Sequence, residues 1–243
     1  MSNYFKFFPT VDYKFGDETT NAKFKNISIY TDVLDQVADA TSSYQDYFII
    51  PGERPDHVSA KLYGTSEYHW TFYLMNDTIR EQRWPVTDSR LYDLSLEKYS
   101  TKVITTRSKL TDKLKIGQTL SGGSSGATAT IGKRNLDLGQ LFLENVSGTF
   151  IAGENVNSTN TNGDIETITI FSFTDQYNTV HHYENADGSY ADIDPEVGPG
   201  VLLTGVTYFN RLEKLNTANR QLKVIKPTII NEVVRAFRDA VRS

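Results

Sequence analysis

The sequence of 243 residues contains no cysteine. This absence excludes a disulfide framework, thiolate zinc sites and a thiol nucleophile, so packing has to stabilise the fold. No apolar run approaches the roughly 20 residues that a membrane-spanning helix needs. Residues 1–8 also lack the apolar region of a signal peptide. The sequence therefore predicts a soluble protein that is made in a cytoplasm and has no membrane partner.

Basic residues are too few to give the chain a positive field. The sequence has 25 Lys and Arg against 30 Asp and Glu, and its formal net charge is -5. Because no overall field attracts a phosphate backbone, we expect no nucleic-acid partner. Aromatic residues, by contrast, make up 12% of the chain, with 14 Tyr and 13 Phe. Such rings serve both in cores and where one subunit buries surface against another.

The start of the chain is rich in aromatic side chains, which are expected to be buried against other protein surface. They are Phe5, Phe7, Phe8 and Tyr13. Two interpretations stay open: a strand that packs on this chain's own core, or a surface that docks on a neighbouring subunit. Residues 27–30 then predict a short strand, and Thr31 and Asp32 predict the start of a helix through residues 33–37.

Residues 47–76 predict a strand followed by a tight helical hairpin. An apolar strand at residues 47–50 meets the breaker pair Pro51-Gly52. Arg54 and Pro55 then begin a helix, because proline is favoured in the first helical turn.

Single residues mark the helix ends in this region. Gly64 is the expected left-handed cap of the first helix, and Ser66 is the expected N-cap of the second, which carries Trp70. Trp84 closes the unit, and Asp88 is the expected cap of a further helix.

Between about Thr105 and Phe173 the composition shifts to Gly, Ser, Thr and Asn, which predicts an inserted all-β module. Strands are expected at residues 127–131, 141–146 and 165–173. The glycine-rich run at 122–126 predicts a hairpin turn, and residues 155–162 predict a polar loop. A module of about 70 residues is long enough to fold alone as a small barrel.

Two amphipathic helices are expected after the insert. The first runs from Tyr208 to about Leu222, with Arg220 on its outer face. The second begins at Pro227 and carries apolar residues at helical spacing, namely Ile229, Ile230, Val233, Val234, Phe237 and Val241. Because such a helix does not persist alone in water, it docks either on this chain's own body or in a partner's groove.

His181 and His182 lie beside acidic residues that are possible metal ligands. Adjacent histidines on a strand are expected to point to opposite faces, which keeps them from sharing one ion. A calcium loop aligned on Asp187 and Gly188 has Tyr183 where its first carboxylate belongs. We therefore expect an ordinary polar turn at Asp187-Gly188, no metal site and no cofactor.

Common catalytic motifs are also missing. The 122–126 run is not followed by the Gly-Lys-Ser/Thr of a phosphate loop, and no serine sits in a Gly-x-Ser-x-Gly elbow. His57 and His69 lie on expected amphipathic helices, where a packed or surface histidine is ordinary. A paired-carboxylate glycosidase stays open, since acidic pairs carry no spacing signature. We interpret the chain as a non-enzymatic protein.

The strand, Pro-Gly break and helix pair at about residues 44–86 resemble the glycan-binding LysM module. The expected fold class is therefore α+β, with a LysM-like strand-helix-helix body and flanking helices in residues 1–104. Residues 105–173 form the inserted barrel-like domain, and residues 174–243 return to the body and end in the amphipathic helix. The LysM resemblance alone implies one alternative function, the binding of cell-wall glycan.

Several short motifs also stand in a fixed order along the chain. They are Phe5-Lys-Phe-Phe-Pro9, Asp46-Tyr47-Phe48-Ile49-Ile50, Gly52-Glu-Arg54-Pro55, Leu62-Tyr63-Gly64, Tyr68-His-Trp70, Leu74-Met75-Asn76-Asp77, His181-His182-Tyr183-Glu184 and Val224-Ile225-Lys226-Pro227. Together they resemble the baseplate wedge proteins of contractile-tailed bacteriophages, of the gene-fifty-three type. Ordered, separated motifs are harder to match by chance than a single one. The β module is a departure from the shorter relatives of that family.

This resemblance implies a virion structural protein that joins baseplate wedge subunits during tail assembly. Its partners would be other wedge proteins and neighbouring wedges in a hetero-complex, and it would catalyse no reaction. The candidate partner-binding residues are Phe5, Phe7, Phe8, Tyr13, Arg54, Tyr63, Trp70, Trp84, Val234 and Phe237. The protein would be synthesised in the host bacterial cytoplasm and end in the tail baseplate of the virion.

Overall fold

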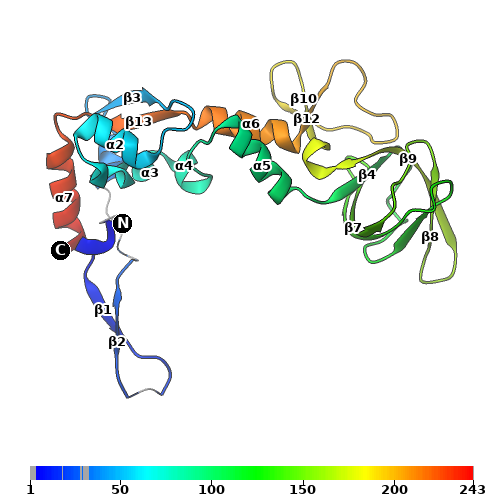
Figure 1. The fold of residues 1–243 in the computed structure, drawn as a ribbon, viewed down its shortest axis with the longest axis horizontal. Coiled ribbons are helices and arrows are strands. Elements are labelled where there is room, and N and C mark those ends of the chain that lie inside the picture. The colour runs from blue at the N-terminus through cyan, green and yellow to red at the C-terminus, as the bar shows by residue number, and fades with distance from the viewer. Residues whose placement is uncertain (1–3, 18, 28, 30–32, 243) are drawn as a thin grey trace. The chain divides into compact units, whose positions relative to one another are not determined.

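A computed structural model of the chain describes residues 4–17, 19–27, 29 and 33–242. The chain divides into two compact units, one of residues 1–87 and 215–243 (unit 1) and one of residues 88–214 (unit 2). The predicted α+β class is confirmed. The described residues contain seven α-helices, several small sheets and a closed barrel of six antiparallel strands (Figure 1). None of these helices is long and apolar enough to span a bilayer.

Unit 1 is built on a two-stranded antiparallel sheet whose strands lie far apart in the sequence. β3 (Tyr44–Phe48) pairs with β13 (Gln221–Ile225). The strand predicted at 47–50 therefore begins earlier than expected, and Ile49 and Ile50 lie beyond the ladder. Ile49 is nonetheless buried in an apolar cluster of unit 1, and its backbone N–H bonds to the carbonyl of Arg220 at 2.8 Å.

The predicted helical hairpin is present as α2 (Pro55–Tyr63) and α3 (Trp70–Met75). Gly64 ends α2 in the left-handed region, with φ 71°, and donates its N–H to the carbonyl of Ala60. The predicted N-cap Ser66 is wrong. His69 holds the N-cap position of α3 and makes no side-chain cap bond, while Thr65 caps the preceding 3-10 turn η2 (Ser66–Tyr68) by accepting the N–H of Glu67. α4 (Asp77–Glu81) follows α3.

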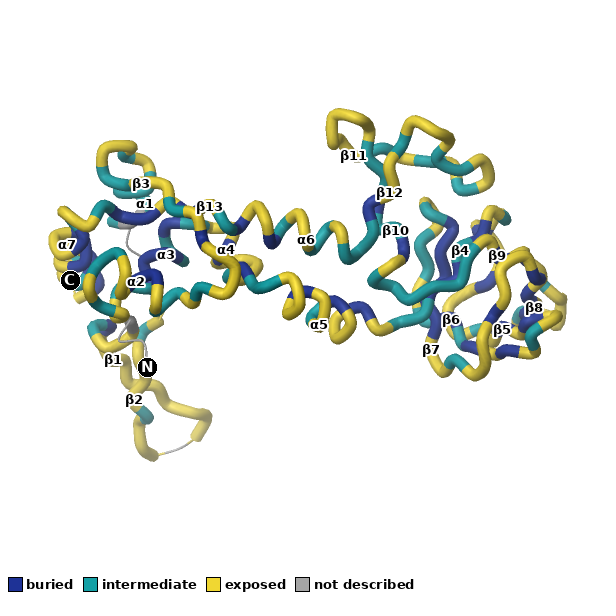
Figure 2. The backbone as a smooth tube through the Cα atoms, turned by 45° about the horizontal axis from the view of Figure 1, so that its top comes forward, coloured by how far each residue is buried: buried dark blue, intermediate teal, exposed yellow. Residues whose placement is uncertain are grey.

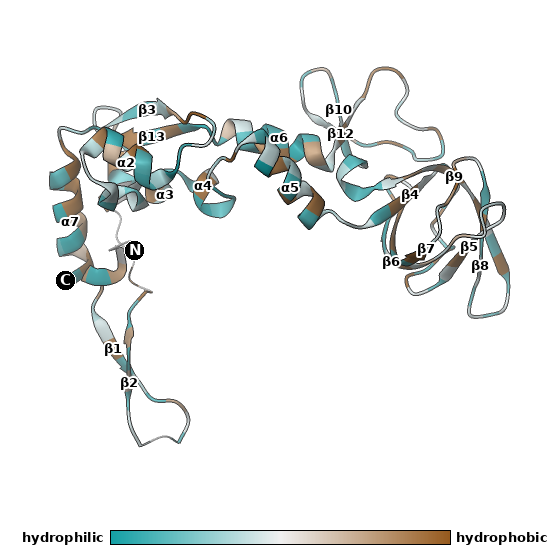
Figure 3. Ribbon diagram, in the orientation of Figure 1, coloured by the Kyte–Doolittle hydropathy of each residue, from teal (hydrophilic) through white to brown (hydrophobic). Residues whose placement is uncertain are grey.

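Two apolar clusters fill unit 1. One joins the sheet to α2, α3 and α4 and consists of Ile49, Val58, Phe72, Ile79, Leu222 and Val224. The other receives the C-terminal helix α7 (Ile230–Arg242) and consists of Phe8, Trp70, Met75, Ile225, Ile230, Val233, Val234, Phe237 and Val241. Of the two alternatives for this helix, the structure shows docking on the chain's own body. Figure 3 shows the alternation of hydrophobic and hydrophilic residues along α7 that makes this possible.

A short helix α1 (Val33–Asp39) also contributes to the second cluster, where Val33 and Val37 are partly buried. This is the helix predicted through residues 33–37. Its predicted start signals, Thr31 and Asp32, lie outside the described residues.

The barrel of unit 2 takes in a few residues on either side of the predicted β module. Its strands, in the order in which neighbours pair, are β4 (Lys102–Thr106), β7 (Gln140–Ser147), β6 (Thr128–Asn135), β5 (Thr119–Gly122), β8 (Asn155–Thr159) and β9 (Ile165–Asp175). Inward side chains such as Leu120, Ile131 and Ile168 fill its interior. The predicted turn at 122–126 joins β5 to β6, which confirms that prediction.

The predicted polar loop at residues 155–162 is wrong for its first half, because residues 155–159 form β8. Val156 and Ser158 point inward, while the outward Asn155 and Asn157 accept hydrogen bonds from threonine hydroxyls on β9 at 2.8 and 2.7 Å. A strand inside a closed barrel has its backbone bonded on both sides, so it needs no apolar run.

The remainder of unit 2 comprises α5 (Asp88–Lys98), a 3-10 turn η3 (Gln176–Asn178) and a small sheet in the order β11-β10-β12. Its strands are β10 (Val180–Glu184), β11 (Tyr190–Ala191) and β12 (Thr204–Thr207). α6 (Tyr208–Ala218) follows. The helix predicted to about Leu222 is therefore too long: Arg220 lies in the turn after α6, and Leu222 lies in β13.

Candidate protein interaction site

The N-terminal segment folds into a hairpin with two chemically different faces. β1 (Thr10–Tyr13) pairs with β2 (Ala22–Lys25). Paired residues share a face and alternate residues share a face. One face therefore carries Val11, Tyr13, Ala22 and Phe24, and the other carries Thr10, Asp12, Lys23 and Lys25. We call Val11, Tyr13, Phe24 and the adjoining Phe15 the aromatic face.

The aromatic face is open to solvent. Tyr13 is 54% exposed, Phe15 49% and Phe24 46%. Their rings pack edge to face on one another, with centroids 4.8 Å apart for Tyr13 and Phe15 and 5.7 Å for Phe15 and Phe24. Figure 2 shows the hairpin exposed along almost its whole length. Exposed apolar clusters of this kind mark protein interaction sites, and a two-stranded hairpin without a cover is marginal in water.

The base of the hairpin is fixed to unit 1. The 3-10 turn η1 (Tyr4–Phe7) leads into Phe8, which is only 3% exposed. The Arg238 guanidinium of α7 lies 4.2 Å from the centroid of the Phe7 ring. Lys25 donates to the carbonyl of Phe8 at 2.7 Å. Phe8 therefore packs in this chain's own core, whereas Tyr13 is exposed to solvent.

Three further candidate residues meet inside unit 1. The Trp70 and Phe237 ring centroids are 4.8 Å apart, and Val234 is 1% exposed in the same cluster. These side chains are buried, because the apolar face of α7, which carries Val234 and Phe237, packs against Trp70. Their measurable role in this structure is to hold α7 in place.

Tyr63 and Trp84 also make internal contacts. Tyr63 donates its hydroxyl to the carbonyl of Ile225 at 2.9 Å, and burial raises the pKa of this phenol. Trp84 donates its indole N–H to the carbonyl of Glu53 at 2.7 Å. Arg54, in contrast, is exposed and pairs with Asp56 at 3.2 Å.

Phe5 is 49% exposed beside the hairpin base, and its ring centroid lies 5.4 Å from that of Phe8. The sequence reasoning missed Phe15 and Phe24, although an alternation signal was available. Val11, Tyr13 and Phe15 are spaced by two on one side of a polar turn, and Ala22 and Phe24 on the other. The strand predicted at 27–30 is not supported where it can be seen, since β2 ends at Lys25 and Ile27 lies in a turn.

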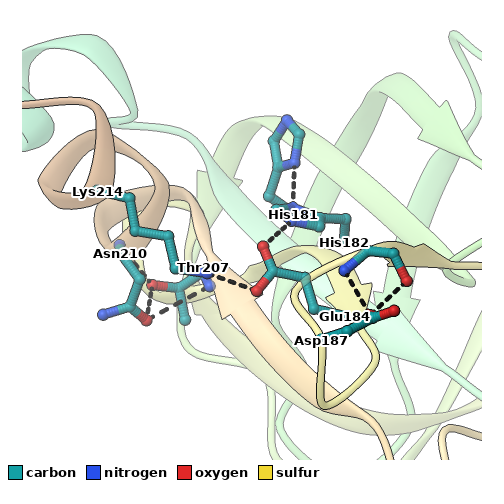
Figure 4. Close-up of polar contacts among 8 residues, drawn as sticks. His181, His182, Glu184, Asp187, Thr207, Asn210 and Lys214 are labelled. Atoms are coloured by element: carbon teal, nitrogen blue, oxygen red, sulfur yellow. Dashed lines mark hydrogen bonds and ion pairs between the residues drawn. The ribbon is translucent and has the colours of Figure 1, made fainter. Parts of the chain in front are cut away.

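The histidine pair forms a hydrogen-bonded chain that ties β10 to α6 (Figure 4). His181 Nδ1 and His182 Nδ1 are 2.9 Å apart, and His182 Nε2 lies 2.9 Å from a Glu184 carboxylate oxygen. The other Glu184 oxygen accepts from Lys214. The expectation that the two rings point to opposite faces is wrong, because a register shift between Val180 and His182 bends the strand.

The side chains in this chain of contacts already have hydrogen-bond partners within the protein. An Nδ1 to Nδ1 hydrogen bond needs one ring without a proton on that atom, so the two histidines are not both cationic in this arrangement. Burial, followed by the nearby Arg211, lowers the pKa of His181, and the hydrogen bond from Lys214 lowers the pKa of Glu184. In the described part of the chain, no three His, Asp or Glu side chains are placed to hold one metal ion. Asp187 instead accepts the backbone N–H and hydroxyl of Ser189 in the predicted polar turn.

The glycine-rich turn at 122–126 does cradle an anion, which is the chain's own Glu154. Its carboxylate accepts the backbone N–H groups of Ser124 and Ser125 at 3.0 and 2.9 Å and that of Ile151 at 2.7 Å. A Cβ on Gly122 would lie 3.0 Å from both carboxylate oxygens. The Glu154 carboxylate therefore occupies the space in this turn where an external anion would bind.

A groove of about 1000 Å³ lies beside strands β5, β8 and β9 and is lined both by polar side chains and by the exposed Ile116 and Ile165. Its carboxylate, Glu166, accepts from the backbone N–H of Leu114 at 2.7 Å and from the side chain of Gln118 at 3.1 Å. Asn160 accepts from the N–H groups of Asn162 and Asp164. The polar groups of this groove thus bond to one another and hold the loops that close the barrel.

The chain matches no protein-family model, and no curated protein is significantly similar to it.

Proposed function

We propose that this chain is a non-enzymatic structural subunit that docks on other proteins through the aromatic face of its N-terminal hairpin. The observation that carries the proposal is the half-exposed cluster of Tyr13, Phe15 and Phe24 on a hairpin with a fixed base. A few residues carry most of the binding energy of a protein interface, and aromatic side chains are enriched at its centre. The ordered sequence motifs support a more specific role as a baseplate wedge subunit of a contractile phage tail, with other wedge proteins as partners.

The test is co-assembly with the products of the reading frames that neighbour its gene. The double variant Tyr13→Ser and Phe24→Ser is expected to weaken co-purification about tenfold or more, because both rings leave the interface. The matched control is Asp12→Asn with Lys23→Gln, on the opposite face of the same strands. Unchanged binding of the aromatic variant, or equal loss in the control, would contradict the proposed interface.

The alternative is binding of cell-wall glycan by the LysM-like unit. A groove of about 640 Å³ beside the start of α2 favours this second candidate, since Tyr73 flanks a polar lining that includes Arg54, Glu67 and His69. Trp70 is unsuitable as a probe because it is buried. Saturable sedimentation of the full chain with peptidoglycan, lost in Tyr73→Ala, would favour the glycan function over the docking function.

A further inference from the structure

The loop between β11 and β12 ends in an unusually exposed apolar tip. Val201 is 99% exposed, Leu202 84% and Val197 78%. Figure 2 shows most of this loop as exposed. Folded proteins seldom leave adjoining aliphatic side chains fully in water unless they bind something. We call Val197, Val201 and Leu202 the apolar tip.

The loop is held around Val197 by a turn of its own and by Arg107, which follows the barrel strand β4. Asp194 accepts the N–H groups of Val197 and Gly198 through its backbone carbonyl at 3.1 and 2.7 Å. Arg107 donates to the carbonyl of Val197 at 3.0 Å, and its guanidinium lies 4.5 Å from the centroid of the Phe171 ring. A Cβ on Gly198 would overlap the Arg107 guanidinium. A loop held in this way binds with less loss of conformational entropy than a free one.

The surroundings of the tip are acidic. Asp192, Asp194 and Glu196 are exposed, while the intervening Ile193 and Pro195 are partly buried and line a groove against the barrel, with Lys109 nearby. An apolar tip beside three carboxylates complements an apolar pocket with a basic rim, and it is repelled by an anionic membrane.

We infer that the apolar tip is a second docking element, which inserts into an apolar pocket rimmed by Lys or Arg on a partner protein. The inference rests on the proposed function, because the partner is sought among the proteins that co-assemble with this chain. It adds a surface on unit 2 to the hairpin surface on unit 1, so the chain bridges two sites in an assembly.

The test uses the full chain co-expressed with the products of the reading frames that neighbour its gene. Val201→Ser with Leu202→Ser is expected to weaken binding about tenfold, and Asp192→Lys with Glu196→Lys to weaken it similarly. Ile116→Ser with Ile165→Ser is the matched control, because these side chains are 64% and 73% exposed elsewhere on unit 2. The control is expected to bind as the wild type does. A photo-crosslinking residue in place of Leu202 is expected to label a partner peptide that contains Lys or Arg.

Other outcomes overturn the inference in distinguishable ways. If wild-type complexes form and the tip variants bind normally, the tip is not a docking element, although the proposed function stands. If phosphatidylglycerol vesicles sediment the wild type but not Val201→Ser with Leu202→Ser, the occupant is a membrane. If crosslinks join only copies of this chain, the occupant is a second copy. If the wild type assembles with none of these proteins, the inference fails together with the proposed function.

Discussion

Val234→Asp is expected to unfold unit 1 rather than merely to detach a partner. Val234 is 1% exposed and packs in the cluster that joins α7 to Trp70 and Phe237. A carboxylate there loses its hydration inside an apolar cluster, which costs about 4 kcal/mol of the free energy of unfolding. That is a large part of the stability of an ordinary domain.

Tryptophan fluorescence isolates this effect. The chain has two tryptophans, Trp70 and Trp84, and both lie in unit 1. Urea denaturation followed by their emission is expected to show a much lower midpoint for Val234→Asp, or emission typical of unfolded protein before urea is added. Ala236→Asp is the matched control, since Ala236 is exposed on the same helix and the charge change is identical. Equal midpoints for the two variants would show that α7 does not need its apolar face.

The fate of α7 illustrates what a single sequence can determine. The helical spacing of Ile230, Val233, Val234 and Phe237 identified the helix and its buried face. The same spacing is compatible with this chain's own core and with a partner's groove, because periodicity specifies a face and not what covers it. The covering residues, Trp70 and Met75, lie far away in the sequence.

Long-range pairing also explains the errors at the strands. The sequence predicts a helix that continues to about Leu222, because Leu222 follows the spacing of the preceding leucines, but Gln221–Ile225 is a strand. It becomes β13 because the backbone of β3 has a free edge that it can pair with. Likewise, the polar residues of β8 have no apolar signal, and their strand exists because β5 and β9 bond to it from both sides.

The position of the candidate interaction site could be predicted from the sequence, but its extent could not. Aromatic density placed it at the N-terminus, where Phe5 and Tyr13 are indeed exposed. The division between inward Phe8 and outward Tyr13 depends on the hairpin register and on its anchoring by Lys25. The apolar tip could not be predicted, because it has no sequence motif and is recognised only by the exposure of its side chains in the structure.

Glu154→Gln is expected to loosen the barrel at its glycine-rich turn. Glu154 is 6% exposed, and its carboxylate accepts from the N–H groups of Ser124, Ser125 and Ile151 and from the Ser125 hydroxyl. Burial alone raises the pKa of this carboxyl, but the hydrogen bonds outweigh it and lower the pKa from 4.5 to about 2. Glutamine turns one acceptor oxygen into an NH₂ donor that faces these N–H groups. We expect a loss of about 2 kcal/mol in the stability of the barrel.

The pH dependence of this loss follows from the depressed pKa of Glu154 in the folded state. Its stabilising effect is complete above about 4.5, the unfolded value, and declines as the pH falls towards about 2. The difference between wild type and Glu154→Gln in thermal denaturation is therefore expected to be largest near neutral pH and to shrink below pH 4.5.

At neutral pH, hydrogen exchange at Ser124, Ser125 and Ile151 is expected to be faster in the variant, because these amides lose their acceptor. The matched control is Glu144→Gln on β7, whose side chain is exposed, and it is expected to match the wild type. A pH-independent difference, or unchanged exchange at these three amides, would mean that the turn keeps its shape without the carboxylate.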